Sequence, residues 1–475
     1  MKRYSLIALA TATLAVVACK DNPVANPIDA PTVDALSGGL TRTSLLQLTI
    51  GALAQDRTTT NDIQFAIEGG ILGRDVYRID ASEPRYVTET LGGNPDPGSF
   101  AGGRGFSGYY TAIRAENTIL EALNSAPTTI FTAAEISAQR GFIRTMKATE
   151  YWRLIETRDT VGVPIQSDDP SAVTPVRCKE AVLSYIAALL DSALTDFNTA
   201  GATTKLPVKL PGGFTQYGRD YQVVSNLILF NRGWKGKVDF YRGLDRKAYT
   251  ASLFPTAITE LTQALGGAAP GAVPKADFVK GVYYNFVPGG SENQPNVISD
   301  AKVGLNPLVG DSVQAGDTRA SKIVPRALLS ATYSGTTVGT TITYTGAVAS
   351  PANQALPLAI LRDEELVLLR AQAYIEAGQL ANALLDINDV RTNYGLAPLA
   401  PFADKQSAID AVLYEKRYSL LFEGWSRVDD LREYGRLNAT YLRKELPTDP
   451  FNAALPITRA ELDARGVSTN PACEA

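Results

Sequence analysis

A regular spacing of apolar residues near the C-terminal third constrains the fold of this chain most. The residues are Leu380, Ala383, Leu384, Ile387 and Val390. Their intervals of three and four place them in one stripe along an α-helix. A second apolar segment precedes them, and Gly378 lets the chain reverse between the two. The segment 361–394 therefore predicts a helix pair of the tetratricopeptide type, although an ordinary helical hairpin has the same pattern.

Further amphipathic segments predict helices at 40–57, 109–124, 133–158, 179–199, 221–241 and 256–265. With 45% hydrophobic and 20% charged residues, the composition is that of a globular protein. We expect a mainly α fold, with a single helical domain over residues 40–475, long irregular loops and a few short β-hairpins. Alternating Thr, Val, Ile and Tyr at 332–344 predict one hairpin, and segments 69–108 and 266–317 are expected as long loops.

The start of the chain is typical of a bacterial lipoprotein. Lys2 and Arg3 precede an apolar run that ends at Cys19, which is too short to span a bilayer. We interpret residues 1–18 as a signal peptide and Cys19 as the lipidated, palmitate-carrying N-terminus, although Cys19 could instead follow an ordinary cleavage site. Three prolines lie between residues 21 and 34, so residues 19–39 are expected to form an extended tether.

The composition also excludes several functions. The chain has no His, which excludes a Ser-His-Asp site and a His-ligated metal. Its 45 basic and 49 acidic residues give a formal charge of -4, so nucleic acid is not an expected partner. We find no phosphate-binding loop and no nucleophile-elbow motif. The sequence predicts a protein that is not an enzyme and needs no cofactor or metal.

Two cysteines remain besides Cys19. Cys178 and Cys473 could form a disulfide in an oxidising compartment, but the sequence leaves this pairing open.

Aromatic and polar residues in the two long loops are the candidates for ligand binding. An aromatic ring can stack on the apolar face of a sugar, and neighbouring polar groups can bind its hydroxyls. The candidates are Arg74, Tyr77, Tyr86, Asn94, Phe100, Phe106, Tyr283, Tyr284 and Phe286, with Asp75, Asp96, Glu292 and Asn293 as further polar groups. For each aromatic residue, the alternative is that it only packs its loop against the helices.

Several segments match one family's motifs in the order of that family. Residues 361–373 resemble its "LRxxELxLLRAEA" helix, 415–424 its "ERRxELxFEG" and 429–435 its "DLRRyG". Phe106 stands where the family usually has Trp, at the start of "WxxxYxxIxxxN". On these residues the chain resembles the SusD/RagB family of nutrient-binding surface lipoproteins. The spacing departs at Ser426, because the Arg expected there is Arg427.

The resemblance implies a function and a partner. It implies a lipoprotein anchored in the outer membrane and facing the cell exterior, which captures an oligosaccharide or peptide and acts as a lid on a SusC-like TonB-dependent transporter. It also implies that the motif residues build a structural charge network of Glu365, Glu415, Arg417, Glu423 and Asp430. The alternatives are an envelope scaffold that binds another protein through its helices and, less favoured, a glycoside hydrolase.

Overall fold

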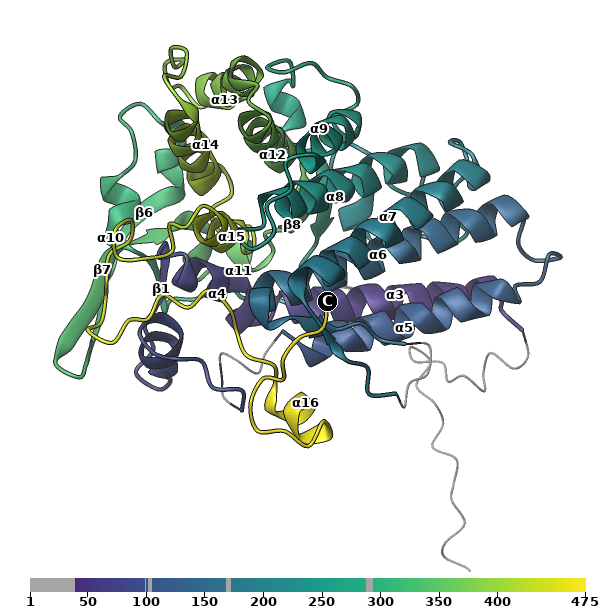
Figure 1. The fold of residues 1–475 in the computed structure, drawn as a ribbon, viewed down its shortest axis with the longest axis horizontal. Helices are drawn as coiled ribbons and strands as arrows, with labels where there is room; N and C mark the ends of the chain where they lie inside the picture. The colour runs from purple at the N-terminus through teal and green to yellow at the C-terminus, as the bar shows by residue number, and fades with distance from the viewer. Residues whose placement is uncertain (1–38, 99, 101–104, 168–171, 288–293) are drawn as a thin grey trace, which may run out of the picture.

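The computed structural model describes residues 39–98, 100, 105–167, 172–287 and 294–475 (Figure 1). The predicted signal peptide, Cys19, nearly all of the tether, and Glu292 and Asn293 lie outside the described residues. Predictions about these parts of the chain stay predictions.

Helices form most of the described chain, which confirms the mainly α prediction. The long helices are α3 (Arg42–Thr60), α5 (Ser107–Asn124), α6 (Ala133–Arg158), α7 (Lys179–Ala200), α8 (Val224–Leu244), α9 (Leu253–Ala264), α12 (Asp363–Glu376), α13 (Leu380–Asn393), α14 (Lys405–Ser419) and α15 (Ser426–Glu433). Local signals set where some of them begin. At α6, Thr132 accepts a hydrogen bond from the backbone N–H of Glu135 and the Glu135 side chain accepts one from the N–H of Thr132, a capping box.

The helices pack in pairs along the chain. Contacts join α6 to α7, α8 to α9, and α12 to α13, and Figure 1 shows α3 and α5 lying along one side of this array. The predicted pair at 361–394 is α12 with α13, and Gly378 turns between them with a φ of 73°. The tetratricopeptide-type pair is therefore confirmed.

The two segments that we expected as irregular loops contain regular structure, so this part of the prediction was wrong. The first segment contains the end of α4 (Ile63–Leu72), β1 (Val76–Arg78) and a π-helical turn (Tyr86–Leu91); the second contains β4 (Gly281–Tyr284), β5 (Val303–Leu305) and α10 (Pro307–Asp311). β1 pairs antiparallel with β5, so Tyr77 lies opposite Gly304. A short strand that pairs with a distant segment leaves no periodic pattern in its own sequence, so the local pattern missed it.

The remaining strands also form two-stranded sheets. β2 (Val163–Pro164) pairs with β3 (Val176–Arg177), β4 with β8 (Leu358–Arg362), and β6 (Ile323–Tyr333) with β7 (Thr336–Tyr344). The last pair is the predicted hairpin, but β6 begins at Ile323, well before the predicted range. A register shift between Pro325 and Leu329 interrupts the alternation there, so the first part of the strand was missed. Short helices are α11 (Pro351–Gln354) and α16 (Arg459–Ala464), with 3₁₀ turns at Asp159–Val161, Gly212–Phe214, Lys275–Asp277, Thr318–Lys322 and Thr345–Ala347.

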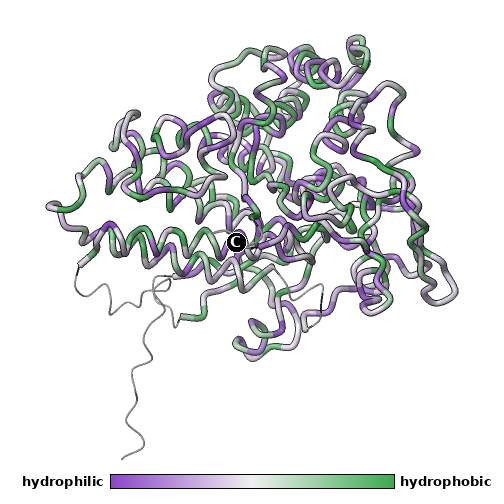
Figure 2. Tube along the Cα trace, turned by 180° about the vertical axis from the view of Figure 1, so that it is seen from behind, coloured by the Kyte–Doolittle hydropathy of each residue, from purple (hydrophilic) through white to green (hydrophobic). Residues whose placement is uncertain are grey.

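One contiguous apolar core extends from Leu40 to Leu462 and includes residues of every long helix named above. Figure 2 shows that hydrophobic and hydrophilic residues alternate along the helices. Among the described residues, no helix is both long and apolar enough to cross a membrane.

Candidate functional site

Most of the candidate ligand residues are buried rather than displayed on open loops. Arg74, Tyr77, Tyr86, Phe106, Tyr283, Tyr284 and Phe286 are each less than a tenth exposed, and so is Asp75. Phe100 is half-buried, and Asn94 and Asp96 are exposed. The candidates do not share one surface, because β1 and β4 carry several of them into the core.

The candidates of the first segment pack against one another and against the body. The Arg78 guanidinium lies 4.0 Å from the ring centroid of Tyr86, and Phe100 meets the same ring edge-on with centroids 4.4 Å apart. Arg74 forms a buried ion pair with Asp449. These contacts are those of a packed interior, which was the alternative reading of the loop aromatics.

Two candidates of the second segment line an open cavity of about 320 Å³. We call it the α3 cavity; its lining residues are Leu46, Ile50, Leu53, Ala54, Arg57, Lys209, Leu210, Pro211, Phe214, Tyr283, Tyr284 and Asn285. One wall is a face of α3, a second is the segment 209–214, and the third is the end of β4 with Asn285. Its size lies within the usual range for small-ligand sites.

The wall formed by segment 209–214 depends on a close approach of backbones. A Cβ at Gly213 would lie 1.9 Å from the carbonyl oxygen of Tyr283, so only glycine fits there. Leu210, Pro211 and Phe214 of the same segment turn apolar surface toward the cavity. In the sequence, residues 211–213 are Pro-Gly-Gly, which indicates only a turn. The lining residues of segment 209–214 could therefore not be predicted from spacing.

Contacts outside the cavity lining fix the side chain of Tyr283. Its ring lies against that of Tyr217, with centroids 4.1 Å apart and planes inclined by 32°, and its hydroxyl donates to the carbonyl oxygen of Val279 at 2.7 Å. The Tyr217 hydroxyl donates to Oδ1 of Asn285 at 2.8 Å, and Nδ2 of Asn285 donates to Oε1 of Gln216 at 3.3 Å. An aromatic wall and a hydrogen-bonded amide edge therefore lie side by side at the cavity.

The floor of the α3 cavity rests on buried acidic groups. The Tyr284 hydroxyl donates to Oδ2 of Asp56, and the Thr60 hydroxyl donates to Oδ1 of the same carboxyl at 3.2 Å. Burial raises the pKa of Asp56. On the neighbouring helices, burial raises the pKa of Glu116 to about 8, and the pKa of Glu150 is also raised by burial and by the charge of Glu116.

The charges that line the α3 cavity are all basic. Arg57 and Lys209 are the charged residues of the lining, and no carboxylate is among the lining residues. An apolar wall, an aromatic ring, an amide and two cationic groups can hold a ligand with apolar and hydroxyl surfaces. General acid–base hydrolysis of a glycosidic bond needs two carboxyl groups, which this lining does not supply.

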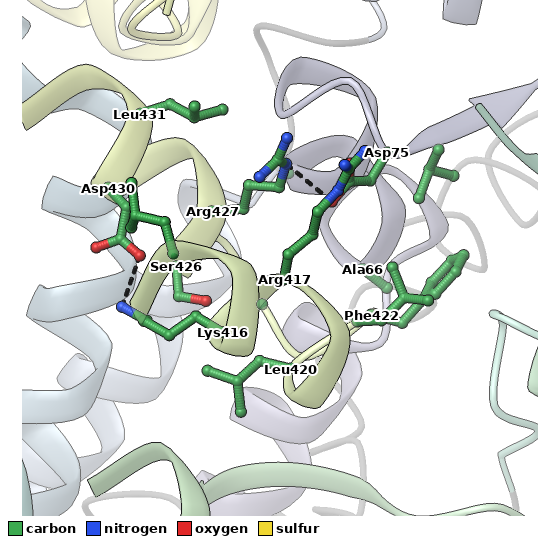
Figure 3. A pocket seen from close by; sticks show the side chains of 16 residues that line it. Ala66, Asp75, Lys416, Arg417, Leu420, Phe422, Ser426, Arg427, Asp430 and Leu431 are labelled. Carbon is green, nitrogen blue, oxygen red and sulfur yellow. Dashed lines mark hydrogen bonds and ion pairs between the residues drawn. The ribbon is translucent and has the colours of Figure 1, made fainter. Parts of the chain in front are cut away.

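The five residues of the expected charge network all form ion pairs. Glu365 pairs with Lys237, Glu415 with Arg319 and Arg391, Arg417 with Asp75, Glu423 with Arg362, and Asp430 with Lys416, at 2.6–2.8 Å. Figure 3 shows Arg417 and Arg427 both pointing at Asp75. Arg427, displaced by one position from the family pattern, thus joins the network, and the cavity between these groups holds only about 40 Å³.

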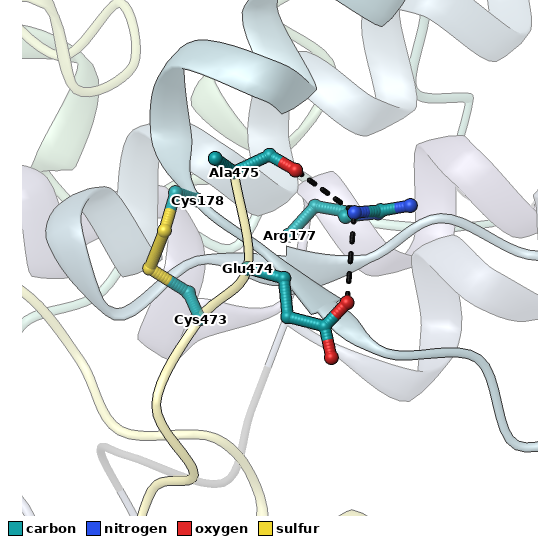
Figure 4. Close-up of a disulfide and its surroundings, with 5 residues drawn as sticks. All are labelled: Arg177, Cys178, Cys473, Glu474 and Ala475. Carbon is teal, nitrogen blue, oxygen red and sulfur yellow. Dashed lines mark hydrogen bonds and ion pairs between the residues drawn. A yellow bond between two sulfur atoms is a disulfide. The ribbon is translucent and has the colours of Figure 1, made fainter.

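The two described cysteines are joined. Cys178 and Cys473 form a disulfide with Cα atoms 4.9 Å apart (Figure 4). Beside it, the backbone N–H of Cys178 donates to the carbonyl oxygen of Glu474 at 2.7 Å, and Arg177 donates to the carbonyl oxygen of Ala475 at 2.9 Å. The C-terminal segment is therefore fixed to the start of α7. No cluster of potential metal ligands occurs among the residues that the structure describes.

Comparison with known families and structures agrees with this picture. Residues 310–456 match the model of the SusD family. No curated protein matches the chain. A SusD superfamily protein from Bacteroides fragilis has a similar structure, with a TM-score of 0.67, 14% identity, and coverage of 92% of this chain and 100% of that chain.

Two similar structures carry names that state a ligand. One is a laminarin-binding SusD-like protein, with a TM-score of 0.63, 16% identity and coverage of 90% of this chain and 98% of that chain. The other is surface glycan-binding protein A from Bacteroides uniformis, with a TM-score of 0.62, 15% identity and coverage of 87% of this chain and 98% of that chain. At these identities the likeness shows a shared fold.

Proposed function

We propose that this chain, whose residues 310–456 match the SusD family model, captures a carbohydrate at the bacterial surface and passes it to a SusC-like TonB-dependent transporter without chemical change. The observation that carries the proposal is the α3 cavity, which combines apolar walls, the ring of Tyr283 and the amide of Asn285. A sugar ring has an apolar face and a rim of hydroxyls, so both kinds of surface find a counterpart there.

Carbohydrate is favoured over peptide as the ligand class. The laminarin-binding and glycan-binding proteins of the same fold support this choice. The absence of carboxylates from the cavity lining supports binding rather than hydrolysis, since a glycosidase needs a general acid and a second carboxylate on either side of the bond.

The anchor and the transporter are parts of the same proposal. Acyl chains on Cys19 and the tether behind it would keep the helical domain at high local concentration over a membrane partner. The expected result of changing Cys19→Ala is release of the protein from the membrane fraction and loss of a co-purifying barrel protein. A soluble wild-type protein, or one that never co-purifies with a barrel, would contradict this part.

The binding site is tested by blocking the cavity. Ala54 lines it from α3, whereas Thr58 is an exposed residue of the same helix outside the lining. We expect the soluble domain to bind at least one of a set of short oligosaccharides from laminarin, starch, xylan, mannan and pectin, measured by isothermal titration calorimetry. Ala54→Trp should abolish the binding event at the α3 cavity, and Thr58→Trp should leave it unchanged.

The outcomes separate the proposal from its alternatives. If no oligosaccharide binds while a protein partner is retained, the scaffold function is favoured. If an oligosaccharide is cleaved and not only bound, the chain is a hydrolase and the proposal is wrong.

A further inference from the structure

A second and larger cavity lies apart from the α3 cavity, against the C-terminal segment. We call it the α16 cavity; it measures about 510 Å³. One wall is formed by the first turns of α5, and another by α16. The third is formed by residues 164, 166 and 172–174. None of the five residues of the charge network lines it.

The α5 side of the cavity is aromatic. Phe106 and Tyr110 both line it, with ring centroids 4.9 Å apart and planes inclined by 58°. The Tyr110 hydroxyl donates to the carbonyl oxygen of Pro164 at 2.6 Å, which fixes the ring. Phe106 was one of the candidates for ligand contact; it is buried, and Tyr110 is the half-buried ring of the pair.

The opposite side is polar and carries two of the three charged lining residues; the third, Arg114, lies on α5. Arg465 and Glu461 of the α16 segment line the cavity and form an ion pair at 2.6 Å. Gln166 lines it as well, and its buried Oε1 accepts no hydrogen bond from any residue that the structure describes. A buried acceptor without a donor is costly, and a ligand hydroxyl is one group that would satisfy it.

The α16 wall depends on the fastening of the C-terminal segment. The backbone N–H of Arg459 donates to the carbonyl oxygen of Pro97 at 2.9 Å, and the N–H of Ile457 donates to Oδ1 of Asn470 at 2.9 Å. Beyond α16 the segment is tied to α7 by the disulfide of Cys473. The disulfide therefore links the segment that carries α16 covalently to the residue before α7.

We propose that the α16 cavity is a second oligosaccharide-binding site, and that the Cys178–Cys473 disulfide holds its wall in place. An aromatic side for the apolar sugar face, and an ion pair and an amide for hydroxyls that both donate and accept, are the chemistry that recognises a neutral sugar. The ligand class rests on the proposed function, but the site is independent of the α3 cavity. Two sites on one chain would let one oligosaccharide, or two strands of a polysaccharide, be held with higher avidity.

The test uses the tightest-binding oligosaccharide of the set above, titrated into the disulfide-bonded domain by calorimetry. Ala460 lines the cavity and is exposed, so Ala460→Trp fills the space without removing core contacts; Asp463→Trp is the matched control, on the same helix and outside the lining. We expect two binding events in the wild type, and one in either Ala460→Trp or Ala54→Trp. Asp463→Trp should keep both.

Removing the disulfide tests the second half of the proposal. In Cys473→Ser only the molecules with α16 in place can bind, so we expect the affinity of the α16 site to fall by about tenfold while the α3 site is unchanged. One binding event in the wild type, removed by Ala54→Trp alone, would overturn the second site and leave the proposed function standing. No binding to any probe would overturn both. Two events that Cys473→Ser leaves unchanged would overturn the role of the disulfide.

Discussion

The protein buries acidic side chains in two regions, and the two regions stabilise them in opposite ways. Around α14 and α15, the carboxylates of the charge network meet guanidinium or ammonium groups at close range; Glu415, for example, accepts from Arg319 and Arg391 at 2.6 Å each. In the layer of α3, α5 and α6 behind the α3 cavity, burial raises the pKa of both Glu116 and Glu150, and the charge of Glu116 raises the pKa of Glu150 further.

This difference separates the scaffold from the ligand-binding face. The residues that match the family motifs form ion pairs with one another, so removing one partner leaves a buried charge. The walls of the α3 cavity come from segments outside those motifs, such as 209–214, and they carry few charges. Changes in the charge network should therefore affect folding, and changes at the cavity should affect binding.

The largest effect is expected at Arg319. This side chain is fully buried and pairs with Asp317 and Glu415 at 2.7 and 2.6 Å. Arg319→Leu leaves both carboxyls buried without their cation, which should lower the free energy of unfolding by about 3–5 kcal/mol in urea denaturation. Arg42, in the half-exposed pair with Glu135, is the control, and Arg42→Leu should cost less than about 1 kcal/mol. Equal losses for the two variants would contradict the comparison.

The second effect is a dependence on pH of opposite sign at two buried carboxyl groups, Glu116 and Asp317. Burial raises the pKa of Glu116 to about 8, so the folded protein keeps a proton that the unfolded chain loses near pH 4.5. Its contribution to stability is complete at acidic pH and is lost as the pH rises toward 8. Between pH 5 and pH 8.5, the free energy of unfolding of the wild type should therefore fall. Because the Gln side chain cannot ionise, the fall in Glu116→Gln should be smaller by at least about 1 kcal/mol. Urea denaturation of the two proteins at several pH values between 5 and 8.5 measures this difference.

Asp317, the second carboxylate partner of Arg319, should respond in the acid direction. Burial alone would raise the pKa of Asp317, but the hydrogen bond and the charge of Arg319 outweigh it and lower the pKa. This group therefore contributes stability above its unfolded pKa near 3.8, and loses it as the pH falls through the lower folded value. A Glu116→Gln variant that still shows the acid loss would confirm that the two regions titrate independently.

The smallest effect concerns binding and leaves folding intact. Tyr217 braces the ring of Tyr283 but is not itself a lining residue of the α3 cavity. Tyr217→Ala should weaken oligosaccharide binding by about 0.5–1.5 kcal/mol, the range found for aromatic pairs, through loss of this support. Tyr217→Phe keeps the ring and is the matched control for the hydroxyl that contacts Asn285. A normal affinity in Tyr217→Ala would show that Tyr283 does not need the brace.

Local signals predicted the helices, and long-range contacts escaped prediction. The boundaries of α6 at Ala133 and Arg158 follow from apolar spacing and a capping box, which lie within the helix and its first turn. The pairing of β1 with β5 joins residues 76–78 to 303–305, and neither three-residue strand has a pattern of its own. Which of the loop aromatics pack into the core was consequently left open by the sequence; Tyr77, Tyr86 and Phe286 are among those that do.

The candidate site was predicted only in part, for a similar reason. Tyr283 and Tyr284 were candidates from the sequence, and the structure places both at the α3 cavity, whereas Asn285, which also lines it, was not identified. The opposite wall depends on Gly213 lying against the backbone of Tyr283, a contact that no local pattern encodes. The resemblance to a family named the acidic and basic members of the charge network, but it did not give the pairing of Arg319 with Glu415.

The disulfide between residues 178 and 473 has a consequence for biogenesis. The two cysteines are separated by 295 positions. If the chain is exported from its N-terminus, as proposed, Cys178 reaches the oxidising compartment long before its partner and waits there as a free thiol. The chain has three cysteines, and Cys19 is the one other thiol with which either could mispair. If the lipid is attached through the sulfur of Cys19, acylation blocks that thiol, and a single correct cross-link is left without any need for a disulfide isomerase.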